Sequence, residues 1–336
     1  MKIFPKISIA LCTNNGGKFL RKQLQSIENQ TLIANEIIIC DDNSTDNTIQ
    51  IIQEFSTKLP IKLYQNKPAL KTIKNFEYAI GLCTGDIIFP CDQDDFWMPQ
   101  KIEKLVKYLI ENPDKEVVCS NARIVNEQLD DLGSSLWDKV RLWEKQISDW
   151  ENGKAFDLLL QGNRVTGCTL AMRHNFAKKA IPFPTNIHPD FIHDGWIGIL
   201  GALNNQIGLL NEPLILYRQH ANQQVGIIQR TTEKVEFSSR FSRPRTQKIA
   251  PLLERSTFYN NLLNYLCNNY PELKQYSQSL QTISEHYKVR SSLPEKRWNR
   301  LKPIARNFIK GNYHRYQDLE SRWYGKYLAI LGDLLE

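Results

Sequence analysis

The sequence predicts an α/β fold, in which helices flank a mostly parallel sheet and a basic, helical C-terminal extension follows. Three observations support this prediction. In the first half, short apolar runs alternate with segments in which apolar residues recur every three or four positions, the pattern of repeated strand–helix–strand units. Carboxylates directly follow two of the apolar runs. The chain has 336 residues, which suffices for one large domain and an appendage.

The first three strand–helix units are predicted within residues 7–82. Their strands are rich in isoleucine and leucine, and each helix has one apolar face. Turn residues connect them, including an Asn-Asn-Gly-Gly turn at 14–17. In chain order, we expect a strand at 7–12, a helix at 18–30, a strand at 36–40, a helix after Asp46, a strand at 61–64 and a helix at 71–82.

The fourth predicted strand, residues 86–91, ends in three carboxylates within four residues: Asp92, Asp94 and Asp95. Open parallel sheets bind ligands at the carboxyl ends of their strands. Clustered carboxylates repel one another, and their hard oxygen atoms suit Mg²⁺ or Mn²⁺, ions that usually carry a substrate diphosphate. The alternative is a solvated acidic turn, but such a turn rarely follows so apolar a strand.

A second carboxylate pair, Asp41 and Asp42, ends the second predicted strand. Either side chain can accept a hydrogen bond from a nucleoside base or ribose hydroxyl, and the alternative is turn and cap chemistry. Lys71 and Lys74 lie on the helix before the carboxylate strand and can reach a phosphate, although an isolated lysine is more often a surface charge.

Several function classes are disfavoured. The chain contains neither the G-x-G-x-x-G dinucleotide pattern nor a G-x-x-x-x-G-K-[ST] phosphate loop. Its seven cysteines form no C-x-x-C pair and lie mostly in apolar runs, which favours a reducing compartment over a disulfide framework or zinc site. No signal-peptide pattern is present, and the longest apolar stretch, 196–203, is too short to span a bilayer. We therefore expect a cytoplasmic protein.

The region after the carboxylates continues the alternation. Pro99 can open the next helix, in which apolar residues recur at spacings of three and four. Further on, Asp194 stands at the start of an apolar helix, and His220 follows the last predicted strand. The remaining expected elements are strands at 117–119, 166–171 and 214–217, with a helix beginning near Arg173.

Four segments in this order carry a family resemblance: Thr13-Asn14, the DDNSTD sequence at 41–46, KNFE at 74–77 and CDQDDFW at 91–97. Together they resemble the family 2 glycosyltransferases, which have the GT-A fold. The D-Q-D-D-x-W form is similar to bacterial rhamnosyltransferase-like members that build surface polysaccharides. The resemblance covers about residues 5–225, and we expect a catalytic domain at 1–228 and a helical extension at 229–336.

The resemblance implies that a donor half, about 1–120, binds a UDP- or dTDP-sugar. Asp92 and Asp94 match the family's D-x-D motif, whose carboxylates hold the donor's divalent metal. Asp41 or Asp42 matches the nucleoside-contacting aspartate, and Thr13, with Asn14 next to it, matches the position beside the base. Which of the two aspartates makes the contact stays open.

The acceptor half, about 121–228, would supply the base. By resemblance Asp194 is the catalytic aspartate; the alternative is a helix N-cap. Inverting transfer needs such a group to take the proton of the attacking hydroxyl, with a metal opposite to stabilise the leaving diphosphate. His220 resembles the histidine that completes the metal or diphosphate site, although a single histidine can equally be a surface or core residue. Arg218 can pair with a phosphate or simply solvate the strand end.

The net charge of +7 arises in the C-terminal third, where aromatic residues lie among lysines and arginines. This pattern is typical of helices that contact an anionic membrane, which would suit a lipid-linked glycan acceptor. The alternative is a helical cap docked through its aromatics. No nucleic-acid-binding motif is present, so we expect no nucleic-acid partner. Trp137, Trp143 and Trp150 can form either a sugar-stacking wall or an apolar face.

Two other functions compete with this one. A sugar-phosphate nucleotidyltransferase should carry a glycine-rich, arginine-containing loop after the first strand, and residues 14–17 lack one. A non-catalytic glycan- or nucleotide-binding scaffold would have no need to retain Asp92, Asp94 and Asp194 together. The sequence therefore favours a glycosyltransferase.

Overall fold

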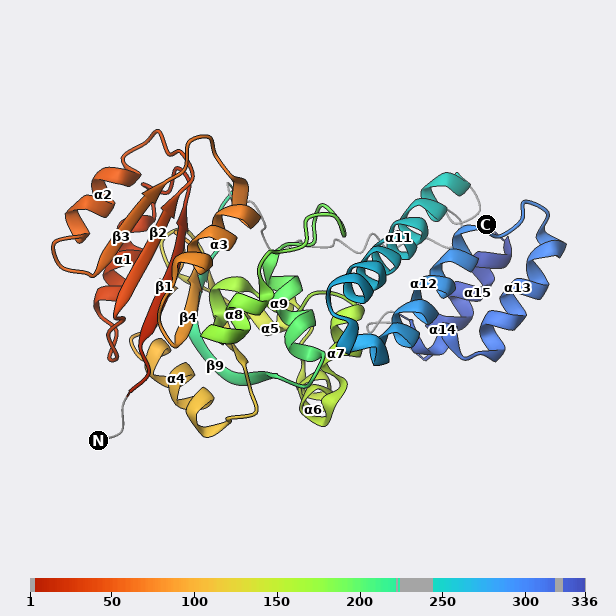
Figure 1. Ribbon diagram of the computed structural model, residues 1–336. Coiled ribbons are helices and arrows are strands. Elements are labelled where there is room, and N and C mark those ends of the chain that lie inside the picture. The colour runs from red at the N-terminus through yellow and green to blue at the C-terminus, as the bar shows by residue number, and fades with distance from the viewer. Residues whose placement is uncertain (1–3, 222, 224–243, 318–322, 336) are drawn as a thin grey trace. The chain divides into compact units, whose positions relative to one another are not determined.

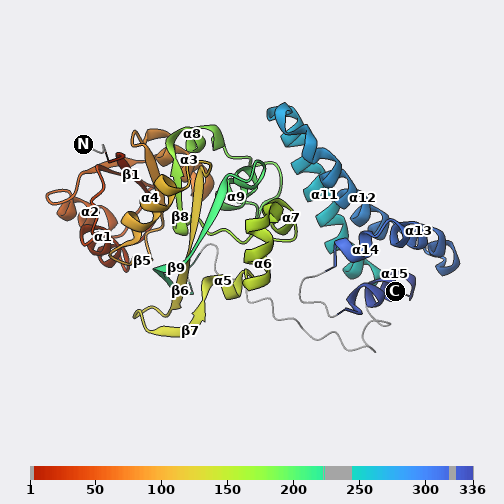
Figure 2. The ribbon, with the colours of Figure 1, turned by 90° about the horizontal axis from the view of Figure 1, so that it is seen from below.

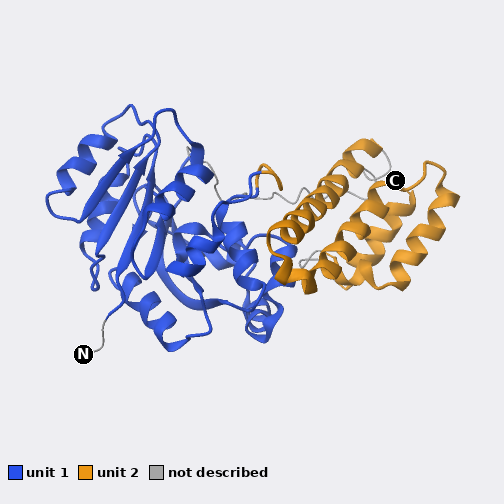
Figure 3. Ribbon diagram, in the orientation of Figure 1, with its two compact units in different colours: residues 1–185, 191–228 blue, residues 186–190, 229–336 orange. Residues whose placement is uncertain are grey.

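The computed structural model describes residues 4–221, 223, 244–317 and 323–335. The chain forms two compact units: residues 1–185 with 191–228, and residues 186–190 with 229–336 (Figure 3). The predicted domain limit at 228–229 lies outside the described residues and stays a prediction. Among the described residues, no helix is both long and apolar enough to cross a bilayer.

The first unit is built on one sheet with the strand order β3-β2-β1-β4-β8-β6-β9-β5, and β7 pairs with β6. The pairs β1–β2, β2–β3 and β1–β4 are parallel, as are β6 and β9, whereas β8 runs antiparallel to β4 and β6 (Figures 1 and 2). The strands are β1 Ile7–Thr13, β2 Glu36–Asp41, β3 Ile61–Gln65, β4 Ile87–Cys91, β5 Phe96–Trp97, β6 Val117–Val125, β7 Asp131–Ser135, β8 Leu170–Arg173 and β9 Ile207–Arg218.

Register places the predicted site residues at one edge of this sheet. Thr13 lies opposite Asp41 in the β1–β2 pair, and Leu11 lies opposite Cys91 in the β1–β4 pair. The turns after β1, β2 and β4 therefore meet, because the carboxyl ends of parallel strands share an edge.

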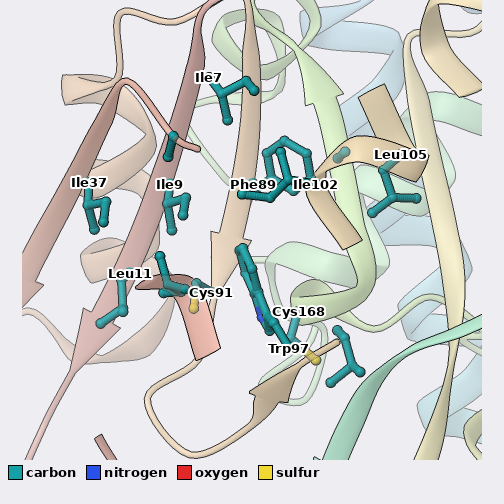
Figure 4. Close-up of a cluster of buried hydrophobic side chains, with 14 of the residues drawn as sticks. Ile7, Ile9, Leu11, Ile37, Phe89, Cys91, Trp97, Ile102, Leu105 and Cys168 are labelled. Atoms are coloured by element: carbon teal, nitrogen blue, oxygen red, sulfur yellow. The ribbon is translucent and has the colours of Figure 1, made fainter. Parts of the chain in front are cut away.

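One core cluster of the first unit lies between the sheet and the layer of helices α1, α2 and α4, and side chains on the other face of the sheet are buried as well. Alternate residues of β1 point into this cluster, with Ile37 of β2 and Phe89 of β4 beside them (Figure 4). Helices α1, α2 and α4 supply its other side, while α3 contacts β1 and β2. The helices are α1 Leu20–Glu28, α2 Thr48–Phe55, α3 Lys71–Leu82, α4 Lys101–Glu111, α5 Leu136–Lys139, α6 Glu144–Asp149, α7 Ala155–Leu160, α8 His174–Ala180 and α9 His193–Ala202.

One predicted strand is partly wrong. Residues 166–171 are not a continuous strand, because Gly167–Thr169 form a 3₁₀ turn before β8 begins at Leu170. The turn packs against His193, and a Cβ on Gly167 would lie 2.8 Å from His193 Nε2. Glycine permits this close approach.

The three tryptophans, for which the sequence left open a sugar-stacking wall or an apolar face, comprise two buried residues and one exposed residue. Trp137 donates from Nε1 to the Ser120 carbonyl at 3.2 Å, and Trp150 donates to the Ile207 carbonyl at the same distance. Both are buried, whereas Trp143 is partly exposed. The first two therefore belong to the core.

The second unit is helical, with a small core of its own. Leu293, Ile304 and Tyr313 are buried there. Asp333 is fully buried and accepts from Tyr313 Oη at 2.6 Å and Arg290 Nε at 2.8 Å. The helices are α11 Arg245–Asn269, α12 Ser277–Ser291, α13 Arg297–Ile309, α14 Asn312–Arg315 and α15 Gly325–Leu335, with a 3₁₀ segment at Pro271–Tyr276.

Cysteine burial follows the sequence pattern. Six of the seven cysteines are buried, and Cys267 on α11 is exposed. All seven are free thiols.

Candidate active site

Asp41 holds together the turn that follows β2. Its Oδ1 accepts from Thr13 Oγ1 at 2.8 Å, and its Oδ2 accepts from the Ser44 backbone N–H at 2.9 Å. Asn43, which lies between Asp41 and Ser44 in the chain, adopts a φ of 63°, a left-handed conformation that asparagine tolerates well. Asp41 and Thr13 are both buried, so their side chains serve the turn chemistry that the sequence left as an alternative.

Asp42 connects β2 to the start of α3. Its Oδ1 accepts from Asn66 Nδ2 at 3.0 Å and from the Leu70 N–H at 2.6 Å, and its Oδ2 accepts from the Lys71 N–H at 2.8 Å. Lys71 has φ of 66°, and the carboxylate stabilises this unfavourable backbone conformation. Asp42 is 6% exposed, and Oδ2 has a lone pair to spare.

The turn after β1 is fastened to the turn after β4 by Gln93. This side chain donates from Nε2 to the Asn14 carbonyl at 3.0 Å and accepts at Oε1 from the Asn14 N–H at 2.8 Å. Asn14 in turn donates from Nδ2 to the Asp42 carbonyl at 2.7 Å. A Cβ on Gly16 would collide with Gln93, so glycine is needed for this approach. The three turns thus form one connected edge.

The end of β9 holds the carboxylate turn in place. Asp94 Oδ2 lies 2.8 Å from His220 Nε2, and both side chains are largely buried. Asp95 accepts at Oδ1 from the Arg218 N–H at 3.2 Å, while Arg218 Nε donates to the Asp94 carbonyl at 2.6 Å. Arg218 is itself buried, so it holds the turn instead of solvating the strand end.

The three carboxylates repel one another. The pKa of Asp92 is raised well above its ordinary value, by burial first and then by Asp94, Asp95 and Asp194. Burial and Asp94 raise the pKa of Asp95 to about 7. A divalent cation would relieve this repulsion, so the residues present fit a metal site.

Within the described parts of the chain, one group has ligand atoms near enough to share an ion: Asp92, Asp95 and Cys168, all within 4.8 Å. Burial raises the pKa of the Cys168 thiol, which keeps it protonated and a poor ligand for Mg²⁺. Asp95 and Cys168 were not predicted as ligands. The predicted Asp94 and His220 lie together, but as a hydrogen-bonded pair.

Lys101 was not predicted from the sequence as a residue of this site. Its side chain is fully buried, with Nζ donating to the Cys168 carbonyl at 2.7 Å and lying 3.3 Å from the centroid of the Trp97 ring. Burial lowers its pKa to about 8, and Asp92 and Asp95 act in the opposite direction. The signal was present in the sequence, because Lys101 stands four residues before the buried Leu105 on the same helical face.

Asp194 lies in the first turn of α9, but it does not cap the helix. The capping position is Ile192, and Asp194 Oδ1 instead accepts from Asn163 Nδ2 at 3.1 Å and from the Gly195 N–H. Burial raises the pKa of Asp194 to about 6. Because Asp194 also raises the pKa of Asp92, the structure brings the predicted base and the carboxylate turn into one region.

The two predicted phosphate-binding lysines have different surroundings. Lys74 Nζ forms an ion pair with Glu77 at 2.8 Å on the same helix, while Lys71 is exposed where α3 begins. Binding of a phosphate by either residue stays a prediction.

Known proteins resemble this chain in sequence. The sequence pattern of "Glycosyl transferase family 2" matches residues 8–176. An uncharacterized glycosyltransferase of Haemophilus influenzae is 28% identical over 228 residues, which are 66% of this chain and 68% of that protein. The dTDP-rhamnosyl transferase RfbG of Shigella flexneri is 28% identical over 275 residues, 75% of this chain and 88% of that protein. The chain spans 59% of the length of a relative from Mycobacterium tuberculosis.

Solved structures share the fold. Residues 1–349 of TarS from S. aureus, crystallised with UDP, align with a TM-score of 0.53 and 18% identity over 84% of this chain and 91% of that one. The mannosyltransferase PcManGT from Pyrobaculum calidifontis, in complex with GDP-Man and Mn²⁺, aligns with a TM-score of 0.50 and 12% identity over 99% of this chain and 86% of that one. The resemblance and the GT-A fold expected from the sequence are thereby confirmed: the chain belongs to glycosyl transferase family 2 and is a glycosyltransferase.

Proposed function

We propose that this glycosyltransferase moves a sugar from a nucleotide-sugar to a glycan hydroxyl, with inversion at the anomeric carbon and dependence on a divalent metal. One observation carries the proposal: a repelling carboxylate cluster at Asp92, Asp94 and Asp95 shares a region with Asp194, a carboxylate whose pKa is raised to about 6. The first feature suits a cation with its diphosphate, and the second suits a general base.

On the donor side, the less buried of the two carboxylates is the one suited to the nucleoside. Asp41 is fully buried, whereas Asp42 keeps some exposure and an open lone pair. Asp42 therefore accepts the hydrogen bond from the base or ribose, and Thr13 and Asn14 shape the turn beside it. Lys71, at the exposed start of α3, lies on the element that Asp42 anchors and is the lysine available to a phosphate.

Asp92 and Asp94 would hold Mg²⁺ or Mn²⁺, with Asp95 behind them and His220 fixing the orientation of Asp94. When bound, the ion supplies Lewis-acid stabilisation of the negative charge on the leaving diphosphate. The structure of PcManGT in complex with both GDP-Man and Mn²⁺ supports this assignment.

Asp194 takes the proton from the acceptor hydroxyl as its oxygen attacks the anomeric carbon. The new carbon–oxygen bond forms while the bond from that carbon to the diphosphate oxygen breaks, and the diphosphate leaves with the electron pair. A direct displacement of this kind needs one base and no covalent intermediate, so it inverts the configuration. Asn163 and the Gly195 N–H hold the Asp194 carboxylate in place through Oδ1, and the Gly167 N–H also bonds to this carboxylate.

The acceptor we propose is a lipid-linked glycan in the synthesis of a bacterial polysaccharide, and the donor is a UDP- or dTDP-sugar. The name of RfbG, a dTDP-rhamnosyl transferase, and the UDP in the TarS structure support the two donor classes. Shape and polar contacts in the donor site would choose among the sugars.

A donor screen tests the proposal. The purified chain would be incubated with UDP-, dTDP- and GDP-sugars and lipid-linked or soluble glycan acceptors, with Mn²⁺ or with EDTA, and products weighed by mass spectrometry. We expect one sugar added per turnover, loss of product in EDTA, and an inverted anomer by NMR. Product formed at an equal rate in EDTA would contradict metal dependence. Nucleotide-sugar made from a sugar phosphate would support a nucleotidyltransferase instead.

A further inference from the structure

Helix α13 of the second unit carries an exposed apolar stripe. Trp298, Leu301, Ala305, Phe308 and Ile309 recur at the spacing that puts residues on one helical face. Trp298 is 84% exposed and Ile309 is 83% exposed. Another face of the helix carries its buried residues, so the stripe lies away from the core of this unit.

The stripe continues onto α15 and the turn before it. The Phe308 and Tyr327 rings lie 6.4 Å apart between centroids, and Tyr327 lies 6.3 Å from Trp323. Trp323 is 77% exposed. Figure 2 shows α13 and α15 within their unit. We name this surface the apolar face, and it comprises Trp298, Leu301, Ala305, Phe308, Ile309, Trp323 and Tyr327.

Positive charges border this face. Arg297, Lys302, Arg306 and Lys310 are exposed on α13 and at its end, and Lys326 lies 5.2 Å from the Tyr327 ring centroid. In the described helices α13, α14 and α15, the one carboxylate is Asp333, which is buried against Arg290. The exposed charged groups of these described helices are therefore all cations, and they lie beside aromatic and aliphatic side chains.

Arg300 differs from the other cations of α13. It is buried, and it donates to the carbonyls of Pro294 at 2.7 Å and Leu334 at 3.1 Å. These bonds fasten α13 to the end of α15. Among the arginines of α13, Arg297 and Arg306 are exposed, whereas Arg300 is structural.

We propose that the apolar face docks on an anionic lipid surface. Tryptophan and isoleucine gain free energy by entering the boundary between lipid head groups and acyl chains, and flanking cations attract anionic head groups. A second copy of the chain is a poorer occupant, because self-association through this face would bring two sets of cations together. The proposal goes beyond the transfer reaction, since docking requires neither donor nor acceptor.

Vesicle flotation of the full chain tests this proposal without any substrate. Wild-type protein should float with vesicles of phosphatidylcholine and phosphatidylglycerol and stay behind with phosphatidylcholine alone. Trp298→Ser/Ile309→Ser should reduce the bound fraction about tenfold, because two large apolar groups leave the interface. Lys302→Glu/Arg306→Glu should reduce the bound fraction by at least about tenfold and make binding less dependent on salt.

Matched controls use the same kinds of change elsewhere in this unit. Leu253→Ser removes an exposed leucine of α11, and Lys274→Glu/Lys288→Glu reverses two exposed lysines outside the apolar face. Both controls should float like the wild type. Transfer to a soluble acceptor should be unchanged in every variant, which separates docking from the proposed reaction.

Three results would overturn the proposal: absence of wild-type flotation, equal losses in the controls, or undiminished flotation of both test variants. Light scattering adds a further outcome. If the wild type is a dimer and Trp298→Ser/Ile309→Ser is a monomer that binds vesicles normally, the face belongs to a second copy. Circular dichroism melting curves identify any variant whose loss of binding reflects unfolding.

Discussion

The side-chain amide of Gln93 makes two hydrogen bonds to the backbone of Asn14, one from each of its polar atoms. The contact joins residues 79 positions apart in the chain. It ties the turn beside the proposed nucleoside site to the turn that carries Asp92 and Asp94. Gln93 therefore fixes the spacing between the two turns that flank the proposed donor site.

Replacing Gln93 by alanine should raise the KM for the donor by about fivefold to a hundredfold, because two hydrogen bonds that set the spacing of the turns are lost. The turnover number at saturating donor should change much less. Steady-state kinetics over a donor series checks this split. Gln53→Ala, an exposed glutamine on α2, is the control and should leave both constants unaltered.

Asp94→Asn should abolish metal-dependent donor binding, since the variant weakens the proposed ligand set and its pairing with His220. Calorimetric titration with UDP or dTDP, with and without Mn²⁺, measures the effect. In the wild type, saturating Mn²⁺ with nucleotide should stabilise the fold, by about 2.7 kcal/mol at a hundred times the dissociation constant. Asp157→Asn, at an exposed position of α7, is the control. An unaltered metal-dependent titration of Asp94→Asn would remove Asp94 from the ligand set.

Asp42→Asn and Asp41→Asn should affect different properties, nucleotide binding in the first case and stability in the second. The first should weaken nucleotide binding by about fivefold to a hundredfold, because the neutral amide accepts the nucleoside hydrogen bond less well. The second should mainly lower the melting temperature, since the fully buried Asp41 serves Thr13 and Ser44. Nucleotide titration and thermal melting of both variants separate the roles. The reverse pattern would assign the nucleoside contact to Asp41.

Asp194→Asn should cut turnover by about a hundredfold or more while leaving donor affinity nearly intact, because an amide cannot take the hydroxyl proton. Single-turnover kinetics at saturating donor, with donor affinity measured by calorimetry, is the appropriate assay. Asn163→Ala offers a graded comparison, since it removes a hydrogen bond to the carboxylate and keeps the base itself. Wild-type turnover in Asp194→Asn would exclude Asp194 as the base.

The pH dependence of turnover should reflect the protonation of Asp194. Burial raises the pKa of Asp194 to about 6, so the carboxylate becomes protonated, and inactive as a base, as the pH falls through that value. Turnover should then decline by about tenfold per pH unit on the acid side. The residual rate of Asp194→Asn should lack this acid limb. Burial and neighbouring carboxylates also raise the pKa of Asp92 and of Asp95, so donor affinity is measured at each pH to separate their protonation from that of Asp194.

Local patterns in the sequence predicted most of the elements that build the sheet. The helix expected at 71–82 is α3, Lys71–Leu82, and the strand expected at 61–64 is β3, Ile61–Gln65. These predictions succeed because a helix or strand that buries one face carries apolar residues at its own period. That period can be read within a single segment of the sequence. The carboxylate turns were found for a related reason, since each directly follows such a strand.

Contacts between distant segments could not be predicted in this way. Nothing near Gln93 in the chain indicates that Asn14 is its partner, and nothing near Gly167 indicates that His193 packs against it. Arg300 likewise has the same sequence surroundings as the exposed Arg297, and only the position of α15 makes it a buried donor. The partners of Gln93 and Arg300 are remote backbone groups, which no local pattern identifies.

The burial of six cysteines has a practical consequence for experiments on this chain. Cys267, on α11 of the helical unit, is the thiol that solvent reaches. A maleimide fluorophore would attach there selectively while the protein stays folded, without any cysteine having to be replaced first. Its emission and anisotropy could then follow the helical unit as lipid or nucleotide is added, in the native sequence.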